Sequence, residues 1–327
     1  MHTRVRFFHS ALLTISLILL LAACQPASAP TSTSAPAEPV TLRFSVLPIL
    51  EALPMYVAQK ENLYEKHGVK VELVPVASAP ERDQLIAAGQ TDGMINEALS
   101  TAFLNKDKVQ AQVVRFARAA TAEEPLFSIL AAGNSGIESP EDLKGVEIGI
   151  SEATIIEYLT DRLLQSEGFT ADEIKKIAVP KIPDRLNLLG TGELKAATLP
   201  EPPVSLALLQ GAKLILDDSK LPELSYSTIT FRKDAIDQNP QAVSGFLAAI
   251  EEAVGLINAD PAKYGDLLVE QTVVPPMLAG KFEVPPFVTA GVPSEAQWKD
   301  MISWAVEKGL LEKELPYADS VNANLLP

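Results

Sequence analysis

The stretch VTLRFSVLPILEALPMYVAQKENLYEKHGVKVELVPV, residues 40–76, decides the fold class of this chain. Apolar and polar side chains alternate over residues 40–46, which predicts a strand with one buried face. Helical spacing of apolar residues follows over 54–67 and is closed by Gly68, and residues 69–76 again predict a strand. Strand, helix and strand in this order predict a βαβ unit and therefore a parallel sheet.

The same alternation continues outward from this unit to about residue 231. Further strands are expected at 93–95, 110–119, 126–132, 146–150, 196–199, 213–216 and 226–231. Further helices are expected at 81–88, 98–104 and 154–167, with another opened by the capping pattern Thr170-x-x-Glu173. The pattern then becomes helical over 240–257, 261–271 and 295–308. We therefore predict an α/β protein with mostly parallel sheets and a helical return.

The first residues predict an export signal. Arg4 and Arg6 precede an almost wholly apolar run over 11–23, which is shorter than the roughly 20 residues that span a bilayer. The run ends in LAAC at 21–24, which resembles the lipobox of bacterial lipoproteins and implies cleavage before Cys24 and lipidation of its thiol. Residues 25–39 are mostly Pro, Ala, Ser and Thr, which predicts an extended tether.

Charge and composition exclude several classes of function. The chain has 27 Lys+Arg, 42 Asp+Glu and a formal net charge of −15, with no basic cluster of the kind that binds nucleic acid. Cleavage after residue 23 leaves His67 as the last histidine, and the single cysteine is taken by lipid. This excludes Cys-His catalysis, multi-His metal sites and a disulfide. We expect no catalytic residue, no metal and no cofactor.

Four segments resemble, in order, the substrate-binding proteins of NitT/TauT-type ABC transporters, the SsuA/THI5-like (NMT1) family. They are residues 40–93, SPEDLKGVEIGIS at 139–151, TLPEPPVSLALLQGAKLI at 198–215 and ELPYADSVNANLLP at 314–327. The resemblance implies a two-lobed type II periplasmic-binding-protein fold with ligand in a cleft that closes by hinge motion. It implies lobe 1 at 40–130 plus 229–327 and lobe 2 at 131–228, with hinge crossings near Ala131 and Tyr226.

Ligands of open α/β sheets lie beyond the carboxyl ends of strands, near helix N-termini. This rule selects the turns after four of the expected strands, and the family resemblance adds the turn at 199–202. The candidate ligand-binding residues are Pro48, Ile49, Leu50, Glu51, Ser78, Asn96, Glu97, Ser151, Glu152, Thr154 and Glu201.

Each candidate also has a purely structural interpretation. Ser151 and Thr154 have the residue types of helix N-caps, and Asn96 can satisfy the backbone of its own turn. The glutamates can be solvated or turn residues. Three other residues are expected to be structural: Tyr56 and Tyr158 in the core, and His67 at a helix C-terminus.

The ligand class follows from charge. Glu51, Glu97, Glu152 and Glu201 occupy the candidate turns, which carry no basic residue. Sulfonate or nitrate would be held best by Arg or Lys together with backbone N–H groups, and nothing in the sequence places the nearest ones, Arg82 and Arg115, in the cleft. We therefore predict a neutral or cationic organic ligand, for example a thiamine-precursor pyrimidine or riboflavin, both implied by the resemblance.

The predicted function is that of a monomeric solute-binding lipoprotein that delivers a small molecule to an ABC permease and its ATPase. It would be anchored through Cys24 to the outer face of the cell membrane or lie in the periplasm. Three alternatives stay open: a sulfonate or nitrate binder in the same role, a THI5-like pyrimidine-synthesis enzyme, and a sensing or adhesive lipoprotein without a permease. The identity and affinity of the ligand stay open as well.

Overall fold

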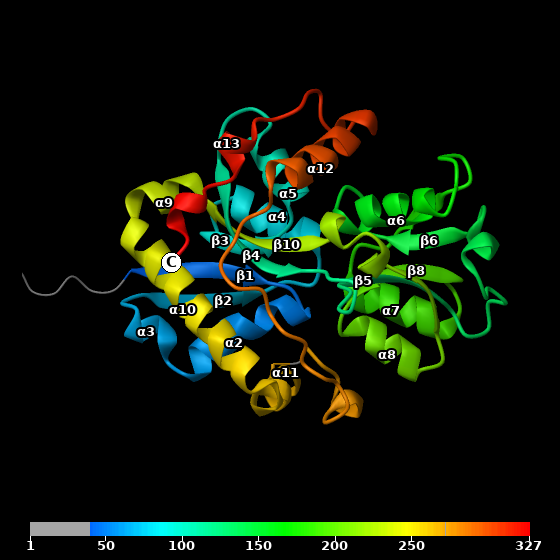
Figure 1. Ribbon diagram of the computed structural model, residues 1–327, viewed down its shortest axis with the longest axis horizontal. Helices are drawn as coiled ribbons and strands as arrows, with labels where there is room; N and C mark the ends of the chain where they lie inside the picture. The colour runs from blue at the N-terminus through cyan, green and yellow to red at the C-terminus, as the bar shows by residue number, and fades with distance from the viewer. Residues whose placement is uncertain (1–39, 272) are drawn as a thin grey trace, which may run out of the picture. The chain divides into compact units, whose positions relative to one another are not determined.

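The computed structural model describes residues 40–271 and 273–327, and these contain two five-stranded mixed sheets (Figure 1). Cys24, the export signal and the tether lie outside the described residues. The first sheet contains β1 (Thr41–Val46), β2 (Lys70–Pro75), β3 (Gly93–Asn96), β4 (Ala111–Ala119) and β10 (Tyr226–Arg232). The second contains β5 (Phe127–Ala131), β6 (Glu147–Ile150), β7 (Lys175–Ala178), β8 (Ala196–Pro200) and β9 (Lys213–Asp217). The α/β class is confirmed.

Both sheets combine a parallel part with one reversed strand. In the first, ordered β2-β1-β3-β10-β4, β1 is parallel to β2 and β3, and β10 is antiparallel to both of its neighbours. In the second, ordered β7-β6-β8-β5-β9, β6 is parallel to β7 and β8, and β5 is antiparallel to β8 and β9. The carboxyl ends of the parallel strands therefore define one functional edge in each lobe.

The chain crosses between the sheets earlier than the sequence predicted. β5 pairs along its whole length with β8, and β10 pairs with β3 and β4. The crossings therefore lie at 120–126 and 218–225, and the predicted boundaries at 130 and 228 fall inside β5 and β10. Hydrogen-bonded strand pairing, which a single sequence does not display, decides this difference.

Asp218 joins the two crossing connections. One of its carboxylate oxygens accepts from the backbone N–H of Leu126 at 2.9 Å, and the other accepts from the N–H of Phe127 at 3.0 Å. The second oxygen also accepts from the hydroxyl of Ser225. Burial raises the pKa of Asp218 to about 6 despite these hydrogen bonds.

The helices largely follow the apolar periodicity. They are α2 (Leu53–Lys60), α3 (Leu63–Lys66), α4 (Ala79–Ala87), α5 (Ala98–Asn105), α6 (Ile155–Ser166), α7 (Ile182–Thr191), α8 (Pro203–Leu209), α9 (Lys233–Gln238), α10 (Pro240–Ala259), α11 (Gly265–Glu270), α12 (Glu295–Glu307) and α13 (Tyr317–Ser320). The single helix predicted over 54–67 is divided at Asn62, whose left-handed φ of 56° an asparagine tolerates. The helix predicted to open at Thr170 is absent from the described residues: Glu173 accepts from the backbone and hydroxyl of Thr170 in a turn, and β7 follows.

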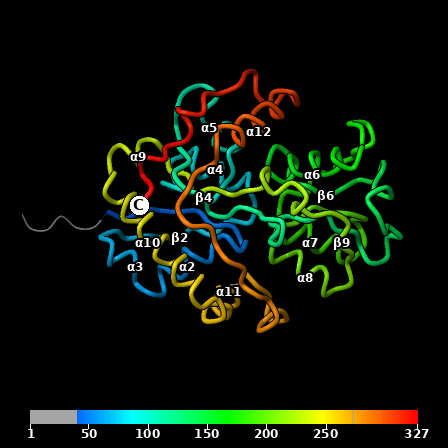
Figure 2. Tube along the Cα trace, viewed as in Figure 1, coloured from blue at the N-terminus to red at the C-terminus, as the bar shows by residue number. Residues whose placement is uncertain are grey.

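The core of lobe 1 forms where α10 packs on the first sheet. The Phe246 ring stacks on Phe44 at a centroid distance of 4.7 Å and meets Phe231 edge-on at 5.2 Å. By length and apolar composition α10 is the one helix of the described residues that could cross a membrane, but more than half of it is buried inside the protein. The C-terminal segment returns to the same lobe (Figure 2). There the N–H of Asn322 donates to the carbonyl of Val113 at 2.8 Å.

α12 joins the helical return to lobe 2. Trp304 is buried, and its indole N–H donates to a carboxylate oxygen of Asp161 on α6 at 3.1 Å. One turn away, the Tyr158 hydroxyl donates to Asp300 at 2.5 Å. Tyr158 is therefore a core residue, as predicted, and Tyr56 is also buried. His67 is the C-terminal cap of α3, as predicted, and its imidazole lies 2.9 Å from the carboxylate of Glu252.

Candidate functional site

A cavity lies between the lobes where the carboxyl ends of β1, β3, β6 and β8 meet. Its apolar lining includes Ile49 and Ile95 from lobe 1 and Phe127 and Ile182 from lobe 2. The cavity measures about 50 Å³, and a water needs roughly 10–15 Å³ by the same measure, so there is room for only a few waters. An organic ligand would need the lobes to move apart before it could enter.

The predicted candidates divide into two groups. Those that line the cavity are Ile49, Glu51, Asn96, Glu97, Ser151 and Thr154. Those that do not are Pro48, Leu50, Ser78, Glu152 and Glu201. The second group has other surroundings: the Ser78 hydroxyl accepts from the N–H of Glu81 as the cap of α4, Glu152 is exposed, and Glu201 binds Ser205.

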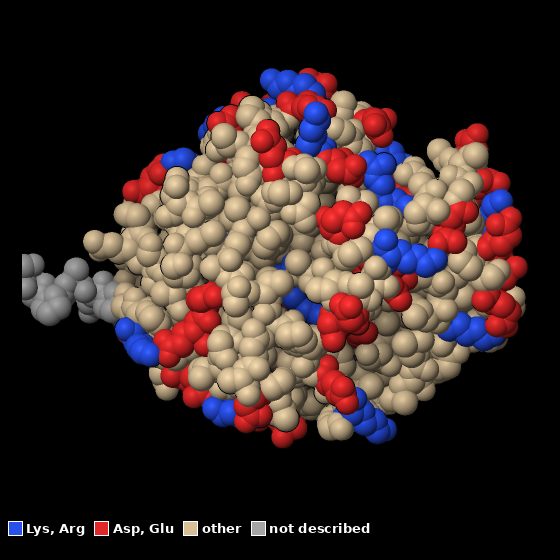
Figure 3. Space-filling view, in the orientation of Figure 1, with Lys and Arg blue, Asp and Glu red and all other residues tan. Residues whose placement is uncertain are grey.

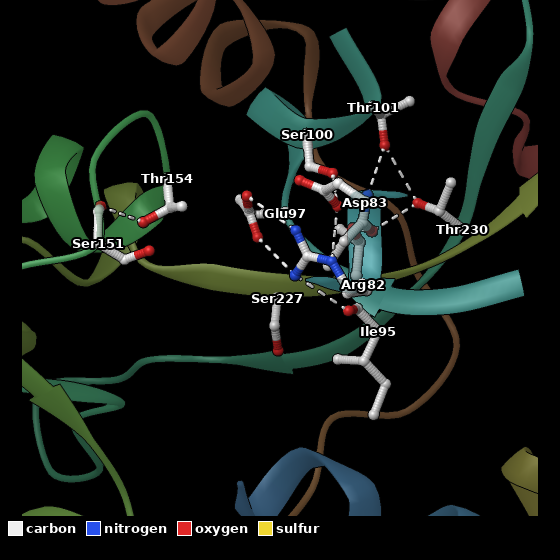
Figure 4. A network of polar contacts seen from close by, with 12 residues as sticks. Arg82, Asp83, Ile95, Glu97, Ser100, Thr101, Ser151, Thr154, Ser227 and Thr230 are labelled. Atoms are coloured by element: carbon white, nitrogen blue, oxygen red, sulfur yellow. Dashed lines mark hydrogen bonds and ion pairs between the residues drawn. The ribbon is translucent and has the colours of Figure 1, made fainter. Parts of the chain in front are cut away.

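Glu97 forms a buried ion pair with an arginine that was not predicted in the cleft. Arg82 on α4 is fully buried and lies 3.3 Å from a carboxylate oxygen of Glu97, which follows β3 (Figure 4). Arg82 also donates to Asp83 at 2.8 Å and to the carbonyl of Ile95 at 3.2 Å. Burial raises the pKa of Glu97 even beside this cation. The positive charge of Arg82 therefore compensates much of the negative charge of Glu97 and Asp83 in this part of the cleft.

Asn96 is held by hydroxyl groups of lobe 1. Its amide oxygen accepts from Thr228 at 2.8 Å and from Thr230 at 2.7 Å, and its amide nitrogen donates to Thr101 at 2.9 Å. These bonds fix the orientation of the amide. Asn96 therefore orders the carboxyl end of β3, and one amide proton is left for a further partner.

Ser151 and Thr154 lie on the opposite side of the cavity, at the start of α6 (Figure 4). The Thr154 hydroxyl accepts from the N–H of Ile156 at 3.2 Å and donates to the carbonyl of Ser151 at 2.7 Å, so Thr154 caps α6 as predicted. The sequence Thr154-x-x-Glu157 has the spacing of a capping box, but Glu157 accepts from the N–H of Ala153, one residue before the cap. Among the described residues, the buried Ser151 hydroxyl has no partner.

Arg185 on α7 also lines the cavity, although it was not among the residues predicted there. It is fully buried, and its guanidinium donates to the carbonyl of Val179 at 2.7 Å. In the part of the chain that the structure describes, its Nε has no partner, and no carboxylate acts on its charge. Burial lowers its pKa to about 10. The sequence did contain a signal, because Arg185 shares the apolar face of α7 with Ile182 and Leu189.

Glu51 lies on the lobe 1 side of the cavity. The Ser227 hydroxyl donates to it at 3.4 Å, and burial raises the pKa of Glu51 although the Arg118 charge opposes this. Arg115 lies outside the cavity, because its guanidinium binds Glu251 at 2.6 Å and the carbonyl of Val288 at 3.0 Å. On the face shown in Figure 3, acidic and basic side chains are interspersed.

A model of the family described as NMT1/THI5 like matches residues 50–264. The chain belongs to this family. A Brucella abortus protein named as a proposed binding protein is 26% identical over 221 residues, which is 64% of this chain and 65% of that protein's length. A Brachyspira hyodysenteriae protein, named as a proposed periplasmic binding protein of an ABC transporter, is 22% identical over 77% of this chain and 74% of its own length.

Solved structures share the fold. The alkanesulfonate-binding protein SsuA of Xanthomonas axonopodis pv. citri, bound to MOPS, superposes with a TM-score of 0.75 at 18% identity, covering 88% of this chain and 99% of that one. The desulfurization enzyme DszB superposes with a TM-score of 0.64 at 14% identity, covering 87% and 97%. The periplasmic-binding-protein fold predicted from the resemblance is thus confirmed, and members of this fold include both binding proteins and an enzyme.

Proposed function

We propose that this protein is the solute receptor of an ABC importer, which captures a small organic molecule outside the cytoplasm and delivers it to a permease. The family, the names of the matched relatives as binding proteins, and a cleft shared by two lobes support this role over catalysis. The same proposal includes export, lipidation at Cys24, a location on the outer face of the cell membrane or in the periplasm, and a monomeric state. These points rest on residues 1–39 and on the family resemblance.

We further propose that the ligand carries an acidic group. One observation carries this: Arg185 brings to the cavity a buried cation that has no carboxylate partner among residues 40–271 and 273–327. Ser151 adds a buried hydroxyl, at the carboxyl end of β6, that has no partner within the same residues. A buried guanidinium and hydroxyl are costly unless an acceptor satisfies them, and an oxyanion supplies one.

The sequence-based prediction of a neutral or cationic ligand counted four glutamates and no arginine at the cleft. Glu152 and Glu201 do not line the cavity among the described residues, whereas Arg82 and Arg185 do, and this supports an acidic ligand instead. A neutral or cationic nitrogen heterocycle is the second candidate, and it is favoured by Glu51, which lines the cavity beside apolar side chains.

Thermal-shift titration tests the ligand class. The chain without residues 1–24 keeps the compact unit of residues 39–327 and would be screened with taurine, an alkanesulfonate, nitrate, a thiamine-precursor pyrimidine and riboflavin. We expect an acidic compound to raise the melting temperature of the native protein but not of the Arg185→Gln variant. Arg232→Gln, a half-buried arginine outside the cavity, is the matched control and should respond as the native protein does.

Two results would contradict the proposal in different ways. Stabilisation by the pyrimidine or riboflavin alone would favour the second candidate and leave the receptor role intact. A ligand that binds in vitro, but whose uptake is unchanged in cells that lack this chain, would overturn the receptor role itself.

A further inference from the structure

A second cavity, of about 250 Å³, lies beside the crossing connections. Its walls come from Leu50 and Arg118 of lobe 1, Glu124 of a crossing, Glu201 of lobe 2, and part of the segment 278–285, which adds the charged side chains of Lys281 and Glu283. It is distinct from the ligand cleft, because Ile49 and Glu51 line the cleft while Leu50 between them lines this cavity. Between the two spaces, the N–H of Leu50 donates to the carbonyl of Glu201 at 3.3 Å, and this hydrogen bond joins the lobes. We call this space the Arg118 cavity.

Arg118 provides a buried cation with unused hydrogen-bond donors. Its side chain is 2% exposed, and its guanidinium carbon lies 5.8 Å from the centroid of the Phe287 ring. Its Nε is buried without a partner among the described residues, where no ion pair or side-chain hydrogen bond of Arg118 is found. A buried guanidinium nitrogen needs an acceptor, and the cavity that Arg118 lines is the space from which one can come.

Carboxylates surround this cation at longer range. Glu51, Glu124 and Glu201 act electrostatically on Arg118 and favour its charged form. Glu201 uses one carboxylate oxygen to accept from the N–H of Ser205 at 3.2 Å and from its hydroxyl at 2.9 Å. The other oxygen of Glu201 and the partly exposed Glu124 remain available to a donor in the cavity.

The two kinds of group restrict the ligand chemistry. A simple anion would bind Arg118 but would also face the nearby carboxylates. A simple cation would meet Glu124 and Glu201 but would leave the guanidinium unsatisfied. A molecule that carries both a negative and a positive group can bind Arg118 and the two glutamates at the same time.

We propose that the Arg118 cavity is a second binding site, which takes a small amino-acid zwitterion with its carboxylate on Arg118 and its ammonium group toward Glu124 and Glu201. This site is separate from the cleft, and it does not depend on which solute the cleft binds.

Isothermal titration calorimetry tests the proposal by measuring the affinity of the chain without residues 1–24 for three probes of similar size: β-alanine, propionate and propylamine. We expect β-alanine to bind at least about tenfold more tightly than either singly charged probe, since a charge-assisted hydrogen bond contributes roughly 1.5–3 kcal/mol. Arg118→Gln should weaken β-alanine binding at least about tenfold, and Arg185→Gln should leave it unchanged.

Glu124→Gln provides an independent test, because this residue is partly exposed and its exchange is compatible with folding. It should weaken β-alanine without weakening propionate. The proposal is overturned if no probe binds, if propionate binds as tightly as β-alanine, or if Arg118→Gln folds and binds β-alanine normally. Loss of β-alanine binding in Arg185→Gln alone would place the zwitterion in the cleft and also overturn it. None of these outcomes changes the expected response of the cleft to its own ligand.

Discussion

Asp218 should make the stability of the protein depend on pH between about 4 and 7. Its folded-state pKa is raised from 3.8 to about 6 by burial at the two crossings. A rise of this size favours the protonated folded state by about 3 kcal/mol. The stabilisation is complete below the unfolded pKa and is lost as the pH rises through about 6. Between pH 4 and pH 7 the contribution of Asp218 to the free energy of unfolding should therefore fall by about 2 kcal/mol.

The Asp218→Asn variant isolates this contribution. The asparagine side chain has one acceptor oxygen and cannot accept from the N–H groups of both Leu126 and Phe127. The free energy of unfolding of the variant at pH 7 should therefore also be lower by about 1–3 kcal/mol. The informative quantity is the pH dependence, which other carboxyl groups affect equally in both proteins. We would measure urea unfolding at pH 4, 5, 6 and 7, with the exposed Glu152→Gln as a control. The reasoning would be refuted by equal pH dependence in the native protein and Asp218→Asn.

Three further substitutions test the packing around the site. Arg82→Met leaves Glu97 buried without its cation and should lower the free energy of unfolding by about 3–5 kcal/mol in urea titration; a loss below about 1 kcal/mol would show that the pair is solvated. Phe246→Ala removes a ring that stacks on Phe44 at 4.7 Å and should cost about 3–5 kcal/mol by the same assay, so an unchanged unfolding midpoint would contradict the described core. Gly93→Ala places a methyl group 2.7 Å from a ring carbon of Phe44 and should cost about 1–3 kcal/mol; a neutral result would mean that the rings shift freely.

Strands and helices were predictable where the apolar periodicity of a single chain segment is enough to identify the element. The alternation over 41–46 and the apolar spacing over 240–257 reflect burial of one face against the core, and both elements form nearly as predicted. The boundary between the lobes was not predictable in this way. β5 and β10 are almost wholly buried strands that could extend either sheet, and only their hydrogen-bonded partners assign them.

The candidate site was predictable in its turns but not in its arginines. Ile49, Glu51 and Ser151 line the cavity because the ends of parallel strands meet at one edge, which is a general property of the fold. Arg82 and Arg185 lie on helices, and they reach the cavity only because α4 and α7 pack with those faces inward. The prediction therefore included the glutamates of the cavity but left out its two arginines.

The sequence by itself determined the α/β class, the family and most of the turns from which a cleft is built. These follow from local periodicity and from motifs that are contiguous in the chain. Only the tertiary structure decided where the chain crosses between the lobes, which cations remain without a carboxylate partner among the residues it describes, and that a second cavity lies behind Leu50. Burial and charge pairing bring together residues that are distant in sequence, and the energy of a buried charge depends on those neighbours rather than on its own segment.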